Sequence, residues 1–203
     1  ILLDCTAVTH EYFPFVLQEY KIVMVNSKVH HSLASGEYNV RRQRCEEGLG
    51  ILKAGLPIQS FRDISSADDL IPFKESMKPE VYDCCKYVVE EIDRTRKAGT
   101  LLRQHDLKAF GQLMYATHEG LSKLYQVSCE ELDYLVEQAK KNAAVIGARL
   151  MGGGFGGCTI NIVQNESVAS FIADISTAYQ QKFNIEPEAY VMSISDGTNR
   201  LTV

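Results

Sequence analysis

A glycine-rich stretch, Arg149 to Cys158, constrains the fold more than any other part of the chain. It reads RLMGGGFGGC, with five glycines in six consecutive positions. Val145 and Ile146 begin an extended segment before it. After it, side chains alternate in character from Cys158 to Val163, which is typical of a half-buried strand. The stretch is therefore predicted to be a turn between two strands.

The strand after this turn excludes the common glycine-rich nucleotide motifs. The dinucleotide fingerprint and the Walker A loop both lead into a helix, and neither pattern occurs here. Glycines permit positive φ angles and let backbone amides approach another surface closely. Such a backbone suits a bound anion or a packed strand. From the residues alone, ligand binding and tight packing both stay open.

The pattern along the chain predicts an α+β fold. Residues 21–26 form an apolar run, expected to be a strand buried on both faces, with a loop over 27–35 and a helix over 36–53. Three helices are expected between about 79 and 142, with starts at Pro79, at Asp106 and at a capping box formed by Ser128 and Glu131. The first of them is expected to end at Gly99. A helix to about 183 and a strand over 189–194 follow the turn.

With an insertion at about 79–142 removed, this order is the βαββαβ order of a ferredoxin-like sheet. The glycine turn is then its central hairpin, and residues 21–203 form one domain. Residues 1–20 read differently. Ile1 to Cys5 starts as a strand, and Phe13–Leu17 is predicted to be a second strand that Pro14 confines to an edge. We expect residues 1–20 to be remnant strands of an N-terminal domain that is missing.

Composition excludes several classes of protein. A net charge of −5 and a pI of about 5.6 argue against a broad nucleic-acid surface. No apolar run approaches the roughly 18 residues of a membrane span. The six cysteines include no C-x-x-C pair and are interpreted as reduced core residues. We expect a soluble, cytoplasmic protein with neither nucleic-acid nor membrane partners.

Two blocks of sequence carry a family resemblance. Residues 147–159, GARLMGGGFGGCT, resemble the third signature motif of the superfamily named for galactokinase, homoserine kinase, mevalonate kinase and phosphomevalonate kinase. Residues 26–47 are similar to the galactokinases in particular. The spacing of the blocks and the helices between them match as well. The resemblance covers essentially the whole chain and implies the C-terminal domain of a two-domain sugar kinase.

The resemblance implies ATP-dependent phosphorylation of galactose to galactose 1-phosphate, with Mg²⁺ bridging the phosphates. In the family, the catalytic and metal-binding residues lie in the N-terminal half, so none is assigned here. Asp4, Glu37 and Arg41 are not given those roles. We expect the chain alone to be inactive. The expected partners are galactose, ATP and the missing N-terminal half.

Two groups of site residues follow from the resemblance. Tyr38 matches the family tyrosine whose hydroxyl contacts the sugar, and Gly152, Gly153 and Gly154 match the loop near the sugar and the transferred phosphate. The helical pattern of Tyr38 leaves a core position open as well. The neighbouring charges of residues 41–47 are interpreted as a solvated helix face with weak pairs along the helix.

The resemblance leaves two other functions open. One is a galactokinase-like regulatory protein that binds sugar and ATP and contacts a partner protein. The other is a kinase of a related sugar, such as N-acetylgalactosamine or arabinose.

Overall fold

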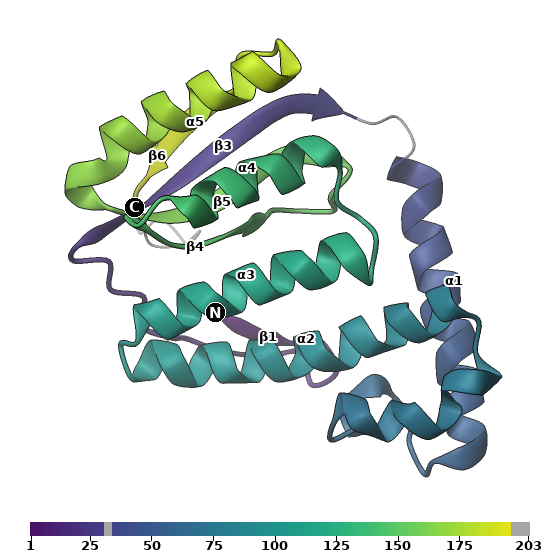
Figure 1. The fold of residues 1–203 in the computed structure, drawn as a ribbon. Helices are drawn as coiled ribbons and strands as arrows, with labels where there is room; N and C mark the ends of the chain where they lie inside the picture. The colour runs from purple at the N-terminus through teal and green to yellow at the C-terminus, as the bar shows by residue number, and fades with distance from the viewer. Residues whose placement is uncertain (31–33, 196–203) are drawn as a thin grey trace, which may run out of the picture.

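The central element is a four-stranded antiparallel sheet. A computed structural model describes residues 1–30 and 34–195. The sheet has the order β4-β5-β3-β6, and its strands are β3 (Tyr20–His30), β4 (Val145–Leu150), β5 (Gly156–Gln164) and β6 (Glu188–Met192). Helices precede β4 and β6, and β4 and β5 form a hairpin (Figure 1). The predicted α+β fold with a ferredoxin-like βαββαβ order is confirmed.

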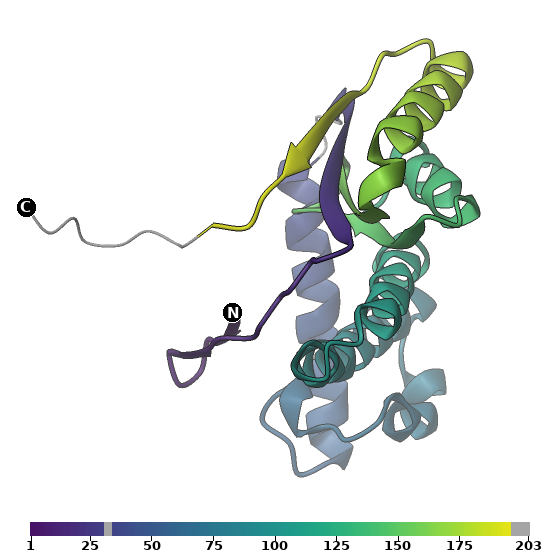
Figure 2. The ribbon, with the colours of Figure 1, turned by 90° about the vertical axis from the view of Figure 1, so that its left-hand side faces the viewer.

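Two helices cover one face of this sheet. They are α4 (Glu130–Lys141) and α5 (Val168–Phe183), which lie side by side in both views (Figures 1 and 2). The predicted order places the helix at 36–53 between the first two strands of the motif. That helix, α1 (Ala34–Gly55), instead lies beside the sheet and packs on α2 (Pro79–Arg103). α4, from within the expected insertion, covers the sheet because its apolar residues form one buried stripe: Leu132, Leu135, Val136 and Ala139.

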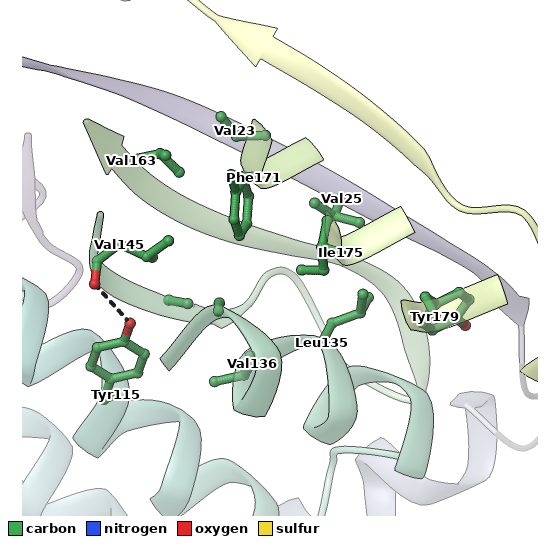
Figure 3. Packing of buried hydrophobic residues seen from close by; sticks show 12 residues of the cluster. Val23, Val25, Tyr115, Leu135, Val136, Val145, Val163, Phe171, Ile175 and Tyr179 are labelled. Carbon is green, nitrogen blue, oxygen red and sulfur yellow. Dashed lines mark hydrogen bonds between the residues drawn. The ribbon is translucent and has the colours of Figure 1, made fainter. Parts of the chain in front are cut away.

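The main core lies between the sheet and these two helices (Figure 3). Val23 and Val25 of β3 are fully buried there against Phe171 and Ile175 of α5. Full burial of one such side chain contributes roughly 1.5–3 kcal/mol. The prediction that residues 21–26 are buried on both faces is wrong. Ile22 and Met24 stay partly exposed, since α4 and α5 cover only the other face.

A second core joins α1, α2 and the segment between them. That segment contains the short 3-10 helices η1 (Phe61–Asp63) and η2 (Ala67–Ser76), and a third, η3 (Asn165–Ser167), precedes α5. The predicted helix starts at Pro79 and Asp106 are confirmed. Pro79 opens α2, and Asp106 caps α3 (Leu107–Lys123) by accepting the Ala109 N–H at 2.9 Å.

Two predicted helix boundaries are wrong, the end of α2 and the start of α4. α2 continues past Gly99 to Arg103. Gly99 is a contact position instead of a helix end, because a Cβ there would lie 2.7 Å from the ring of Phe13. α4 begins at Glu130 after Cys129, whose side chain makes no capping hydrogen bond, so the capping box predicted at Ser128 and Glu131 does not start this helix.

The N-terminal residues form a separate hairpin. β1 (Leu2–Asp4) pairs with β2 (Thr9–Glu11). Phe13–Leu17, predicted to be a strand, has no regular structure; the segment instead packs through Phe15, whose ring centroid lies 5.5 Å from that of Phe110. Arg62 donates to Asp4 and, with nearby backbone amides, lowers the pKa of that carboxyl.

Three further sequence predictions meet the structure here. β3 extends to residue 30, so residues 27–30 are strand rather than loop, while 31–33 lie outside the described residues. All six cysteines are free; Cys84 and Cys85 are buried as expected, but Cys5 is exposed. In the described part of the chain, no helix is both long enough and apolar enough to cross a membrane.

α3 lies directly on the backbone of β4. A Cβ at Gly111 of α3 would lie 2.1 Å from the Ile146 carbonyl oxygen. A Cβ at Gly147 on the strand would lie 2.5 Å from the Cα of Gly111. Both positions therefore require glycine so that helix and strand can touch.

We expect Gly111→Ala to lower the free energy of unfolding by about 1–3 kcal/mol or more, because the added methyl group forces α3 off β4. Gly50→Ala is the matched control. Gly50 is also inside a helix, but its Cβ would meet nothing within 4 Å. Alanine should there stabilise by up to about 1 kcal/mol through helix propensity. Urea unfolding of both variants measures this, and equal stabilities would contradict the close packing.

Candidate active site

The glycine turn connects β4 to β5 and adopts a backbone that few other residues tolerate. Gly152 and Gly154 have φ angles of 78° and 84°. The Met151 N–H donates to the Cys158 carbonyl at 2.9 Å and closes the turn. The predicted hairpin is thus present, and its glycines are required by conformation.

The three central glycines differ in their surroundings. A Cβ at Gly154 would lie 2.0 Å from the Val127 carbonyl oxygen, whereas one at Gly152 or Gly153 would meet nothing within 4 Å. The Phe155 N–H donates to that same Val127 oxygen at 2.7 Å. The turn therefore packs through Gly154 and leaves open space at Gly152 and Gly153.

The last residue of β4, Leu150, forms a hydrogen bond with a buried histidine. The Leu150 N–H donates to Nδ1 of His118 at 3.2 Å. Nε2 of His118 lies 3.1 Å from Asp133, which also accepts from the Ser122 hydroxyl at 2.8 Å. An accepting Nδ1 requires the neutral ring with its proton on Nε2. His118 is thus a packed structural histidine.

Hydrogen bonding also sets the charge of this cluster. Burial raises the pKa of the Asp133 carboxyl, but hydrogen bonds from His118 and the adjacent hydroxyls outweigh burial and lower the pKa overall. Burial alone raises the pKa of the Cys158 thiol at the other end of the turn. A protonated thiol there is a packing group and a poor nucleophile.

Tyr38 lies in the first turns of α1, and 64% of it is exposed. A core position for this tyrosine, left open by the helical pattern, is therefore wrong. Leu52, from the same predicted face, is fully buried, and Leu49 packs beside it. Tyr38 sits beyond the end of that core, where an aromatic ring and its hydroxyl are accessible to a ligand. Contact with the sugar stays a prediction.

The arginines after Tyr38 fall into two environments. Arg42 is exposed and pairs with Glu46, one turn along the helix, as expected for a solvated face. Arg41 is only 6% exposed, so that interpretation is wrong for this residue. The sequence contains no signal that separates two adjacent arginines, because the difference depends on what packs against the helix.

Arg41 brings α1, the helix that carries Tyr38, into contact with the glycine turn. Its guanidinium carbon lies 5.5 Å from the centroid of the Phe155 ring in the glycine turn. Behind the turn is a cavity of about 320 Å³ whose lining includes Gly152, Arg149, Arg94 and Glu91. Tyr38 is not part of that lining. Among residues 1–30 and 34–195, no group of three or more histidine, cysteine or acidic side chains is arranged to hold a metal ion.

Comparison with known proteins identifies the class. Residues 98–180 match the family described as "GHMP kinases C terminal". The L. major mevalonate kinase in complex with R-mevalonate shares the fold, with a TM-score of 0.52 at 19% identity over 88% of this chain and 43% of that chain. With its hairpin and glycine turn, this part of the chain is similar to the C-terminal domain of the GHMP kinases.

Closer relatives narrow this class. The chain is 39% identical to a galactokinase of Clostridium beijerinckii over 99% of its own length and 52% of that protein. It is 35% identical to a galactokinase of Thermotoga neapolitana, over 99% and 55%. Lactococcus lactis galactokinase complexed with galactose matches with a TM-score of 0.91 at 32% identity, over 98% of this chain and 51% of that one. The chain corresponds to the C-terminal half of the galactokinases, and it spans about half the length of these relatives.

We expect Gly154→Ala to destabilise the protein by about 1–3 kcal/mol or more, since alanine adds a clash with Val127 and strain at positive φ. Gly153→Ala is the control, because that position has open space and an ordinary φ. It should change the stability by no more than about 0.5 kcal/mol. Thermal unfolding of the two variants measures this difference in stability. Two equal melting temperatures would mean that the turn does not pack on Val127.

Proposed function

We propose that the protein carrying this chain is a galactokinase, which phosphorylates galactose to galactose 1-phosphate with ATP. The supporting observation is similarity along nearly the whole chain. Both galactokinase relatives align over 99% of it, and the L. lactis structure, which contains galactose, superimposes with a TM-score of 0.91. Since the chain spans only half of each relative, the activity belongs to a protein with a second half.

This chain contributes positioning to the reaction. Phosphoryl transfer depends mainly on orientation and on stabilisation of the charge on the phosphate oxygens. Tyr38 offers an exposed hydroxyl for the sugar. The open backbone at Gly152 and Gly153 offers amide groups near the transferred phosphate. Gly154 keeps this backbone in place against Val127.

The remaining parts of the reaction fall to the N-terminal half. Mg²⁺ would neutralise charge on the ATP phosphates. No group of three or more histidine, cysteine or acidic side chains among the described residues could hold the ion. We assign the acidic group near the sugar hydroxyl, the ATP loop and the metal ligands to that half. The free thiols fit a reducing compartment such as the cytoplasm.

We propose that the N-terminal half also covers apolar side chains that are exposed on this chain. Ile1, Leu3 and Val8 of the N-terminal hairpin are 77%, 56% and 82% exposed. Tyr190 to Met192 on β6 are at least 40% exposed. Large exposed apolar patches are uncommon on free monomers. We propose that the hairpin within residues 1–20 belongs to the domain built by the N-terminal half, whereas Phe15 packs on α3 and Tyr20 begins β3 of this chain.

The first test compares this chain with the longer protein. We expect the 203-residue chain to give no galactose 1-phosphate above background, because it lacks the proposed catalytic groups, while the longer protein is active. A coupled assay for ADP, with galactose, N-acetylgalactosamine and arabinose as substrates, measures this. Turnover by the chain alone would contradict the assignment to the N-terminal half. A different preferred sugar would identify a related sugar kinase, and an inactive longer protein that binds galactose would identify a regulator.

The second test removes the Tyr38 hydroxyl in the longer protein. Loss of one neutral hydrogen bond to the sugar costs about 0.5–1.5 kcal/mol, so Tyr38→Phe should lower kcat/KM for galactose by roughly 2- to 13-fold. Tyr134→Phe is the control, because it also removes one neutral hydrogen bond, to the Ala178 carbonyl at 3.3 Å, but between α4 and α5. Steady-state kinetics with matched melting temperatures measure both variants. Unchanged kinetics in Tyr38→Phe would remove this residue from the sugar site.

A further inference from the structure

Arg41 lies where three separate parts of the chain meet. It projects from α1, three residues after Tyr38. The connection from α3 to α4, residues 124–129, passes beside it, and the glycine turn lies against its guanidinium. The arginine is 6% exposed, although it is charged and belongs to a helix face with exposed neighbours.

Each edge of the guanidinium has a partner. Nε donates to the Tyr125 carbonyl at 3.1 Å and Nη2 to the Gln126 carbonyl at 2.5 Å. Nη1 pairs with the carboxylate of Glu37, the residue before Tyr38. The flat face lies 5.5 Å from the Phe155 centroid, within the range of a cation–π contact. One side chain thus binds the start of α1, the connection and the turn.

The groups that Arg41 contacts have unusual backbone conformations. Gln126 and Phe155 have φ angles of 56° and 57°, in the left-handed region that residues other than glycine seldom adopt. Such conformations persist where surrounding contacts hold them. The two segments are also joined directly, through the hydrogen bond from Phe155 to Val127. Arg41 adds α1 to this pair, and Arg44 of the same helix contributes a longer hydrogen bond, 3.5 Å, to the Gln126 side chain.

We propose that Arg41 is a positioning residue for sugar phosphorylation, which sets the place of Tyr38 relative to the glycine turn. This role rests on the proposed galactokinase function. The guanidinium suits it because its planar fork binds several acceptors in fixed directions while its face packs on an aromatic ring. A lysine in its place keeps the charge near Glu37 but cannot hold two carbonyls and a ring together. A displacement of about 1 Å is enough to reduce the rate up to 100-fold.

The experiment uses the longer protein and the pair Arg41→Lys and Arg42→Lys. Arg42 is the control, since it is the next residue, is exposed and pairs with Glu46 along the helix; its charge also acts on Tyr38, and the change to lysine keeps that charge. We expect Arg41→Lys to lower kcat/KM for galactose by roughly 10- to 100-fold, and Arg42→Lys to leave it within about twofold.

A double-mutant cycle separates positioning from general destabilisation. If Arg41 acts through Tyr38, adding Tyr38→Phe to Arg41→Lys should lower kcat/KM by less than about twofold, because the hydroxyl is already misplaced. In the Arg42→Lys background, Tyr38→Phe should keep its full effect. A merely structural role predicts additive losses in both backgrounds, and additivity would overturn the proposal.

The test also includes a replacement variant and two further decisive outcomes. If Arg41→Lys does not fold, Phe155→Leu replaces it, since this change removes only the ring on the guanidinium face and should give the same non-additivity with Tyr38→Phe. A wild-type protein active on galactose, together with an Arg41→Lys variant of full kcat/KM, overturns the role of Arg41 alone. A wild-type protein inactive on galactose overturns the proposed function, and this role with it.

Discussion

The candidate site depends most on the contact between the Val127 carbonyl group and the glycine turn. The carbonyl group accepts the N–H of Phe155, and it leaves no room for a side chain at Gly154. A backbone-to-backbone contact of this kind fixes a turn more firmly than side-chain packing, because neither partner has a rotamer to change. This contact therefore holds the glycine turn in place, although glycine is the most flexible residue.

The glycine turn keeps its position because the strands at both of its ends, β4 and β5, are fixed. β4 is held from one side by α3, whose Gly111 touches the strand backbone, and its last amide is bound by His118. β5 pairs with β4 on one edge and β3 on the other. Movement of the turn would therefore require movement of the sheet, and the core under α4 and α5 resists that.

α4 and α5 cover one face of the sheet, while α3 and the segment before β3 cover only part of the rest. A buried face stabilises this chain by itself through residues such as Val23 and Phe171. The exposed apolar side chains of the N-terminal hairpin and β6 are left without cover among the described residues. A chain that spans half the length of its relatives has the surface expected of one part of a two-part structure.

The sequence by itself determined the elements whose cause is local. Alternation after the glycines predicts the hairpin, and Pro79 and Asp106 predict two helix starts, because strand periodicity, proline geometry and capping depend on neighbouring residues. The two family motifs located the chain among the sugar kinases. The candidate site residues Tyr38, Gly152, Gly153 and Gly154 were predicted from these motifs, without their surroundings.

Only the tertiary structure decided which of the similar residues are buried. Arg41 and Arg42 share charge, helix and sequence context, yet one is enclosed by the connection after α3 and the other faces solvent. Gly99 looks like a helix end but is a contact for Phe13, and α4 rather than α1 covers the sheet. Each of these outcomes depends on a partner far away in the chain. Local periodicity describes one segment at a time, so it cannot say which distant backbone a side chain will meet.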